Sequence, residues 1–339
     1  MRNFQPLRFS PRHALLAAAI ALSVGSTVAE DLTSRAATLA AEHADQSSLP
    51  GAEQPWRFLV KELRHLGKGD LSQIDRSAAN VEGTDPLPVI TAYISALKDL
   101  GVTVWMVPVP AKAALEPQKL DANLPAPTAS TLAAFLPELE KAGAHVIDLT
   151  ALYLNERAAQ PDRALYCATD SHWSPHGAAL AARAVAEAIS DEPAVRGADP
   201  TAFTVSAPED LAFHGDLLTA EEKASLPAET LPLTTVAPAT TGSSPVLVMG
   251  DSHCQVFHSG GSMHASGGGF IDHLAAALSL PVEEISSQAS GADQPRVDIA
   301  RRTVKEPDFW ERHPVLIWLF TEREFTEGRW REIPARVVR

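Results

Sequence analysis

The sequence predicts an α/β fold, a three-layer α/β/α sandwich with a mainly parallel sheet. Apolar, β-branched runs alternate with helix-like segments from Asp85 to Glu324. Strands that are apolar throughout are typical of parallel sheets that helices cover on both faces. The 339 residues are 45% hydrophobic and 21% charged, so the chain can bury a substantial core.

Residues 1–29 have the features of a secretory signal peptide. Three arginines precede an apolar run from Ala14 to Val24, and small residues offer a cleavage site after Ala29. The run is shorter than the roughly 20 residues of a spanning helix, so we favour cleavage over an uncleaved membrane anchor. We expect a periplasmic protein in which residues 30–339 form a single catalytic domain.

The first half of that domain is predicted to begin outside the sheet and then to enter it. A helix over 31–45 is followed by a turn-rich stretch that holds a short apolar piece, 56–63. The regular alternation then starts. Its predicted elements are, in order, helix 86–101, strand 102–110, helix 130–143, strand 144–150 and helix 175–189.

Residues 191–244 interrupt this alternation, because they are rich in proline, threonine and serine. We expect them to form an excursion outside the core sheet. The alternation then resumes to the end of the fold. The predicted elements are strand 245–250, helix 271–280, strand 282–287, helix 292–305 and strand 315–324.

The stretch TDSHWSPHG, residues 169–177, places an acid and an imidazole two residues apart. Pro175 disfavours the helical conformation in the residue before it, so we expect an extended segment in which Asp170 and His172 share one face. The carboxylate would then reach the imidazole and orient it. Taken alone, Asp170 could merely cap a helix and His172 merely pack.

A nucleophile for this pair is found in the stretch VLVMGDS, where Ser252 follows the end of a predicted strand. Ligands of open parallel sheets bind at the carboxyl ends of the strands, so this hydroxyl should face the same crevice as His172. A serine hydroxyl needs a neighbouring base to become nucleophilic. A GDS tripeptide alone is more typical of a turn, whereas the two motifs together predict a Ser-His-Asp triad.

These motifs resemble those of a known family. GDS after a strand is similar to the nucleophile block of SGNH hydrolases, and Gly291 stands where their next conserved glycine lies. An acid and histidine that precede the serine, as in TDSHWSPHG, resemble the alginate O-acetyltransferase family (AlgJ/AlgX-like). VPVPAK (107–112) and VLIWLFTER (315–323) resemble two further motifs of that family, and the likeness covers most of residues 50–325.

The resemblance implies Ser252 as nucleophile, His172 as base and Asp170 as orienting acid. It also implies acetyl transfer to hydroxyls of an exported, alginate-like polysaccharide through an acetyl-serine. The donor would be presented by a membrane-bound acyl-transfer protein of the MBOAT type, and no cofactor is implied. His253 departs from the family pattern, and no counterpart of the SGNH asparagine is evident. The absence of a carbohydrate-binding module makes the chain more AlgJ-like than AlgX-like.

Two further groups of residues surround the expected triad. Gly291 and Arg323 are candidate oxyanion or substrate-binding residues, although Arg323 could equally form an ion pair with Glu322 or Glu324. Cys167 and Cys254 flank the triad residues, and in an exported protein we expect them to form a disulfide between the two catalytic loops.

Metal and nucleic-acid binding are both disfavoured. Three histidines lie close to Ser252 in the sequence, but their spacing with Cys254 matches no standard zinc site, so we expect no metal. Removing residues 1–29 would take the net charge from −14 to −17, which disfavours nucleic acid as a partner. No basic patch is visible in the sequence.

Three functions therefore stay open at this point. The first is an exported O-acetyltransferase, and the second is a carbohydrate O-acetyl esterase with the same triad. The third is a polysaccharide-binding scaffold without catalysis, which an intact serine, histidine and aspartate disfavour.

Overall fold

The computed structural model describes residues 32–240 and 242–337, and a five-stranded sheet forms its centre. The strand order is β10-β9-β11-β3-β4, and every neighbouring pair is parallel. The strands are β3 (Thr103–Val109), β4 (His145–Val146), β9 (Val246–Gly250), β10 (Glu283–Ser286) and β11 (Val315–Thr321). The predicted α/β class with a mainly parallel sheet is confirmed.

The central strand, β11, shows why the inner strands of the sheet are largely apolar. All seven of its residues are buried. Successive side chains point to opposite faces, so Ile317 lies in one hydrophobic cluster and Trp318 in the other. A strand that is covered on both faces has no polar side, and hence no alternating pattern.

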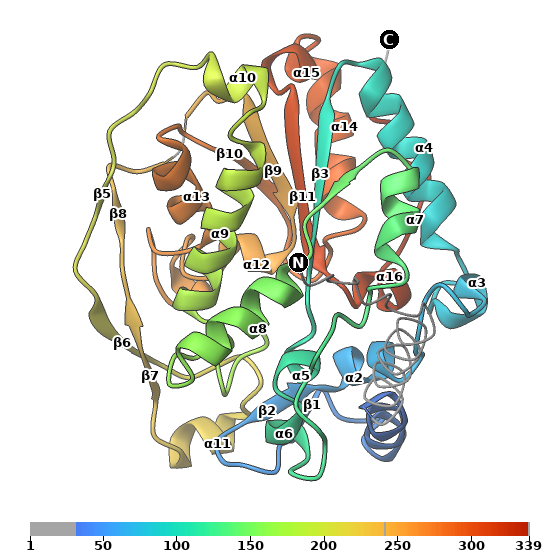
Figure 1. The fold of residues 1–339 in the computed structure, drawn as a ribbon, viewed down its shortest axis with the longest axis vertical. Coiled ribbons are helices and arrows are strands. Elements are labelled where there is room, and N and C mark those ends of the chain that lie inside the picture. Colours follow the sequence, from blue (N-terminus) through green and yellow to red (C-terminus); the bar gives the residue numbers. More distant parts are fainter. Residues whose placement is uncertain (1–31, 241, 338–339) are drawn as a thin grey trace, which may run out of the picture.

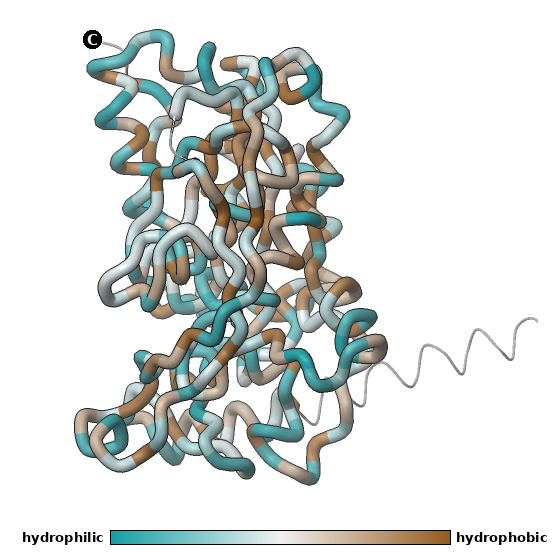
Figure 2. Tube along the Cα trace, turned by 90° about the vertical axis from the view of Figure 1, so that its left-hand side faces the viewer, coloured by the Kyte–Doolittle hydropathy of each residue, from teal (hydrophilic) through white to brown (hydrophobic). Residues whose placement is uncertain are grey.

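Helices form the two outer layers (Figure 1). One layer consists of α8 (Leu149–Ala159), α9 (Pro175–Ile189) and α13 (Phe270–Leu278). The other consists of α4 (Pro86–Asp99), α7 (Leu136–Lys141) and α14 (Gln294–Lys305). Figure 2 shows hydrophobic residues gathered along the strands between these layers.

Local signals account for most helix boundaries. Ser174 begins α9, because its side chain accepts a hydrogen bond from the backbone N–H of Gly177 and Pro175 occupies the first turn. Beyond α4, Gly101 adopts φ +78°, a conformation that glycine tolerates and other residues rarely adopt.

Three predicted boundaries were wrong. The strand expected over 144–150 is only two residues long, because Asp148 caps α8 by accepting a hydrogen bond from Thr150 N. The helix expected over 130–143 is regular only in α7. The last strand ends at Thr321, and a short helix, α16 (Glu324–Glu327), follows it.

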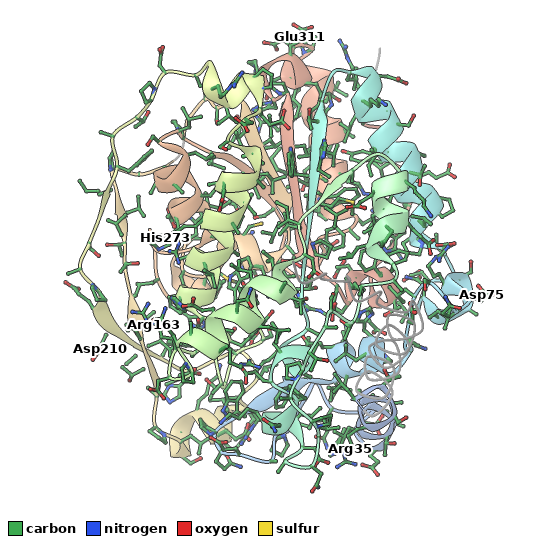
Figure 3. All side chains as sticks on the ribbon, viewed as in Figure 1. Arg35, Asp75, Arg163, Asp210, His273 and Glu311 are labelled. Carbon is green, nitrogen blue, oxygen red and sulfur yellow. The ribbon has the colours of Figure 1, made fainter. Side chains whose placement is uncertain are left out.

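The N-terminal segment forms a separate cluster at the carboxyl ends of the strands (Figure 1). Residues 32–42 are helical, and Figure 3 marks Arg35 in this helix, whose Nε donates to Asp121 at 2.7 Å. The antiparallel pair β1 (Ser48–Pro50) and β2 (Arg57–Leu59) follows. The segment ends with α2 (Val60–Leu66). Two short helices that follow β3 in the chain, α5 (Lys112–Leu115) and α6 (Pro117–Leu120), belong to the same hydrophobic cluster.

The described residues of the 191–244 excursion add no strand to the parallel sheet. They form two small antiparallel sheets instead, β5 (Thr204–Val205) with β8 (Val236–Ala237) and β6 (Glu209–Phe213) with β7 (Glu229–Leu233). In Figure 1 these strands run beside α9 and α13. The excursion thus lies against one helical layer.

Short elements complete the fold. They are α3 (Arg76–Ala79), α10 (Pro193–Arg196), α11 (Ala220–Ser225), α12 (Ser252–Gln255), η1 (Gly261–Met263) and α15 (Phe309–Arg312). Among the helices of the described residues, none has the length and apolarity to span a bilayer. The signal peptide predicted over 1–29 lies outside the described residues.

Candidate active site

The serine of GDS lies at the carboxyl edge of the sheet. Strand β9 ends at Gly250, and Ser252 begins α12 directly after it. Asp251 holds this turn: one carboxylate oxygen accepts the backbone N–H of His253 at 2.8 Å, and the other accepts that of Thr321 at 2.8 Å. Asp251 therefore fastens the end of β9 to the end of β11, and Ser252 follows from a fixed turn.

The TDSHW loop approaches this edge from α9. Backbone bonds on either side of the loop, Cys167 N to His172 O and Ser174 N to Leu165 O, hold its two arms together. The loop bends at 168–172 and does not run extended, which corrects the predicted conformation. The bend lets Asp170 Oδ1 accept the backbone N–H of His172 at 3.1 Å.

The three predicted site residues converge. The distance from His172 Nδ1 to Asp170 Oδ1 is 2.6 Å, and that from His172 Nε2 to Ser252 Oγ is 2.7 Å. All three side chains are buried, with Ser252 7% exposed. An imidazole that bridges a carboxylate and a hydroxyl has the geometry of a base that takes up the hydroxyl proton.

The pKa shifts of Asp170 and His172 are consistent with a carboxylate that stabilises a protonated imidazole. Burial acts to raise the pKa of Asp170, but the charges and hydrogen bonds of His172 and His264 outweigh it and hold that pKa well below its ordinary value. Burial lowers the pKa of His172, yet the Asp170 carboxylate overcomes this effect and raises it above 6.5. The carboxylate therefore stays ionised and favours a proton on the imidazole.

A second histidine, which the motifs did not predict, binds the same carboxylate. The distance from His264 Nε2 to Asp170 Oδ2 is 2.8 Å, and the ring packs between Phe213 and Phe257. Asp170 Oδ2 also accepts the backbone N–H of Asp216 at 2.8 Å. Each oxygen of the acid thus has two donors, which fixes its orientation toward His172.

The excursion contributes further support to the loop. Glu229 accepts hydrogen bonds from the backbone N–H groups of Ala168 and Thr169 at 2.7 and 2.9 Å. Gly215 packs so closely that a Cβ there would lie 2.1 Å from Thr169 O. The segment expected outside the core sheet therefore holds the loop that carries Asp170, a role that its loop-like composition does not reveal.

Lys112, from the VPVPAK stretch, holds the other side of the loop. Its buried Nζ donates to the carbonyl oxygens of Arg57, Ala168 and Asp170 at 2.7, 2.9 and 3.0 Å. The ammonium also lies over the rings of Trp56 and Phe58, 5.0 and 5.2 Å from their centroids. Lys112 thereby joins β2 to the loop that carries Asp170.

The two candidate oxyanion residues lie close to the site. Gly291 packs against Asp251, since a Cβ there would be 3.0 Å from the Cβ of Asp251. The charge of Arg323 lowers the pKa of both Asp251 and His253, and its buried Nη1 has no hydrogen-bond partner among the described residues. The carboxylates of Glu322 and Glu324 instead accept the backbone N–H groups of Ala111 and Ala292.

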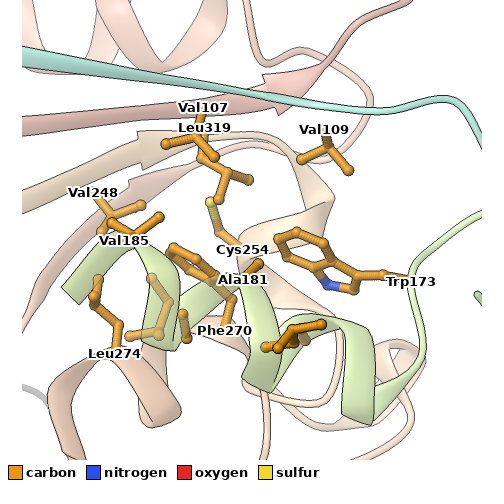
Figure 4. Close-up of a cluster of buried hydrophobic side chains, with 14 of the residues drawn as sticks. Val107, Val109, Trp173, Ala181, Val185, Val248, Cys254, Phe270, Leu274 and Leu319 are labelled. Carbon is orange, nitrogen blue, oxygen red and sulfur yellow. The ribbon is translucent and has the colours of Figure 1, made fainter. Parts of the chain in front are cut away.

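The expected disulfide is absent, because Cys167 and Cys254 are both free thiols in the structure. The Cys167 Sγ donates to the carbonyl oxygen of Trp173 at 3.3 Å. In Figure 4 the sulfur of Cys254 points toward Leu319. Both cysteines are fully buried in one hydrophobic cluster, where they pack as small apolar residues.

The histidines around Ser252 have carboxylate partners of their own. His253 pairs with Asp251 at 3.2 Å, and burial lowers the pKa of His253 to about 4. His258 lies between Asp272 and Glu284 at 2.9 and 3.3 Å.

Ligand-type atoms of Asp170, His172 and Asp216 lie within 4.8 Å of one another. These atoms are engaged in the hydrogen bonds of the catalytic loop. Asp216, for example, accepts from the backbone N–H and the hydroxyl of Ser171, both at 2.7 Å.

Comparison with known proteins identifies the family of this chain. A family model described as "SGNH hydrolase-like domain, acetyltransferase AlgX" matches residues 56–322. The chain belongs to this family. The match contains both the TDSHW loop and the GDS turn, so the family expected from these motifs is confirmed.

Relatives of this AlgX family member carry the name AlgJ. A probable alginate O-acetylase AlgJ of Pseudomonas fluorescens is 29% identical over 252 residues, which are 72% of this chain and 62% of the relative. The corresponding protein of Pseudomonas syringae pv. tomato is 29% identical over 165 residues, 48% of this chain and 39% of the relative. The chain thus spans less than two thirds of the length of these relatives.

Two solved structures share the fold. The O-acetyltransferase domain of Pseudomonas putida AlgJ superposes with a TM-score of 0.61 at 23% identity, covering 84% of this chain and 94% of that one. Pseudomonas aeruginosa AlgX superposes with a TM-score of 0.60 at 18% identity, covering 84% of this chain and 64% of that one.

Proposed function

We propose that this protein is an O-acetyltransferase that acetylates hydroxyl groups of an exported, alginate-like polysaccharide. The observation that carries the proposal is the buried hydrogen-bonded series Asp170–His172–Ser252, with links of 2.6 and 2.7 Å. The acetyltransferase family and the alginate O-acetylases among the relatives support both the reaction and the substrate.

The reaction proceeds in two acyl transfers. His172 Nε2 takes the proton of Ser252 as the oxygen attacks the acetyl carbonyl of the donor, and the proton then passes to the departing donor group. A sugar hydroxyl next attacks the acetyl-serine and gives its proton to His172. That proton returns to Ser252 Oγ as the ester bond to the serine breaks, which leaves the acetylated sugar and the starting enzyme.

Asp170 stays ionised throughout and stabilises the imidazolium that forms in each step. The tetrahedral intermediate needs hydrogen-bond donors for its oxyanion, each worth roughly 3–4 kcal/mol. We assign this role to the backbone N–H groups of Ser252 and Gly291, with the Arg323 guanidinium as a third donor. The unpartnered Nη1 of Arg323 is consistent with such a role.

The acetyl donor comes from a membrane-bound acyl-transfer protein of the MBOAT type, because acetyl-coenzyme A is not expected outside the cytoplasm. The periplasmic location on which this choice of donor depends is inferred from the signal-peptide features of residues 1–29. Detection of the mature N-terminus near residue 30 in periplasmic extracts tests the localisation.

The activity is tested with the mature protein, an activated acetyl ester and a uronate oligosaccharide. We expect acetylated sugar and, before sugar is added, a mass increase of one acetyl group on Ser252. Ser252→Ala should lose both signals, whereas Ser262→Ala, an exposed serine in η1, should keep them.

Other outcomes contradict the proposal. Ester hydrolysis without sugar acetylation would identify a carbohydrate O-acetyl esterase. A complete lack of Ser252-dependent chemistry would identify a binding scaffold.

A further inference from the structure

A cavity of about 750 Å³ lies between α9, α13 and the excursion. Its lining includes residues from the first half of α9, from β7 and from α13, and it contains none of the three side chains Asp170, His172 and Ser252. Ser174 and Pro175 line it, two and three residues after His172. The cavity is thus next to the catalytic loop along the chain but separate from the triad.

Basic side chains gather around this cavity, from three parts of the chain. Arg163 precedes the catalytic loop, His176 and Arg183 belong to α9, and His273 belongs to α13. Figure 3 shows Arg163 and His273 on the side where the excursion strands run. In a chain with a net charge of −14, two arginines and two histidines line this one cavity.

The charges of these residues affect one another. Burial lowers the pKa of His176, and the nearby Arg163 and Arg183 lower it further. Burial likewise lowers the pKa of His273, and Arg183 adds to that effect. Near neutral pH both histidines are therefore uncharged, and the positive charge of the cavity comes from the two arginines.

The two arginines are available for a ligand. Among the described residues, neither Arg163 nor Arg183 forms an ion pair, and the nearest polar partner of Arg163 is the ring of His176 at 3.5 Å. The other ring nitrogen of His176 forms a hydrogen bond with the Glu156 carboxylate at 2.7 Å. Among the lining residues Asp162 carries one carboxylate, against the two guanidinium groups.

The rest of the wall suits a sugar ring. Pro175 begins the fifteen-residue helix α9 at the cavity, which adds the positive end of a helix dipole. Pro208, Leu231 and Pro232 offer apolar surface for the C–H faces of a pyranose, and Thr230 and Thr234 offer hydroxyl groups. The volume falls within the roughly 300–1,000 Å³ of small-molecule sites.

We propose that this cavity binds a carboxylate-bearing saccharide and anchors a uronate polymer beside the catalytic loop. The polymeric nature of the ligand rests on the proposed function, whereas carboxylate recognition rests on the cavity itself. Guanidinium groups bind carboxylates in paired hydrogen bonds, which gives Arg163 and Arg183 the central role. The hairpin β6–β7 that borders the cavity also leads into Gly215 and Asp216, which contact the Asp170 loop.

The test measures binding by calorimetry in the Ser252→Ala background, where no turnover occurs. The probes are an oligouronate and a neutral oligosaccharide of the same length. We expect the oligouronate to bind with an affinity that falls as salt is added, and the neutral sugar to bind at least ten-fold more weakly. Arg163→Gln and Arg183→Gln should each weaken oligouronate binding about ten-fold.

Arg301→Gln is the matched control, because Arg301 is an exposed arginine of α14 with a side chain 71% accessible. The inference is overturned if the oligouronate does not bind, if it binds the cavity variants as tightly as the control, or if the neutral sugar binds equally well. A parallel assay of small-ester cleavage with Ser252 intact should be unaffected by the cavity variants. If the unsubstituted enzyme and all cavity variants fail to cleave the small ester, the proposed acyl chemistry is refuted, and the binding result remains valid.

Discussion

The imidazole of His172 must be uncharged to accept a proton from Ser252, yet its surroundings favour the charged form. Burial opposes the charge, but Asp170, and further away Asp216 and Asp251, stabilise it and raise the pKa above 6.5. The neutral fraction therefore grows as the pH rises through this raised pKa. Activity should follow the same direction.

The first prediction concerns this pH dependence. We expect kcat/KM for acetyl-ester cleavage to rise with pH along a limb whose midpoint lies above 6.5, because only the neutral imidazole acts as a base. Asp170→Asn should move that midpoint to lower pH and reduce kcat by a factor on the order of 10⁴. A midpoint that stays in place in this variant would contradict the role of the carboxylate.

The site residues differ in how well their sequence context reveals them. Asp170, His172 and Ser252 stand in two short motifs, TDSHW and GDS, so their convergence could be predicted from the sequence. His264 lies 94 residues from Asp170 in a glycine-rich loop, and no spacing rule links the two. The disulfide between Cys167 and Cys254 was predicted wrongly, because closeness to the triad residues in the sequence does not determine where the two sulfur atoms point.

At the scale of elements, the alternation of strand-like and helix-like segments was enough to predict all five strands of the sheet, and the three inner strands are largely buried apolar runs. Boundaries failed where a side chain competed with the regular structure, as Asp148 does when it ends β4 and caps α8. The bend at 168–172 was missed for the same kind of reason. There the Asp170 carboxylate binds the backbone N–H of His172, and an extended segment does not provide that bond.

Lys112 gives the second prediction. Lys112→Met keeps the length of the side chain but leaves three buried carbonyl oxygens without their donor. We expect the free energy of unfolding to fall by about 3 kcal/mol, as measured by urea denaturation. Lys98→Met, in the last turn of α4, provides the control and should change stability by less than about 0.5 kcal/mol.

The activity of the folded Lys112 variant separates positioning from stability. Under native conditions Lys112→Met should retain secondary structure but show a reduced kcat, because the Asp170 loop has lost one of its supports. An unchanged kcat would mean that Lys112 serves stability alone.

At the scale of the whole molecule, the loop that carries Asp170 is held by segments that are far apart in the chain. Arg57 N donates to Ala168 O, Lys112 binds the same carbonyl, and Glu229 accepts from Ala168 N. His264 completes the set from a loop beyond α12. The excursion was predicted to lie outside the core sheet from its composition, but its contacts with this loop come from tertiary packing that composition does not encode.

The third prediction tests the excursion. Gly215→Ala would place a Cβ 2.1 Å from Thr169 O, a backbone atom that cannot move without displacing Asp170. We expect kcat to fall at least about ten-fold, with circular dichroism that indicates a folded protein. Gly242→Ala is the control in the same segment, since its Cβ would meet Pro281 at an ordinary 3.5 Å. Equal activity of the two variants would show that the excursion does not position the acid.

The dispersed supports of the Asp170 loop also affect when a nascent chain becomes active. Ribosomes and translocation pores release a protein from its amino end, so the residue-264 imidazole emerges after the acid, the base and the nucleophile. A growing chain thus carries the complete triad before the last donor to its carboxylate has arrived. Assembly of the site also waits until residues beyond 321 have emerged, because β11 lies between β3 and β9 and Thr321 N donates to Asp251.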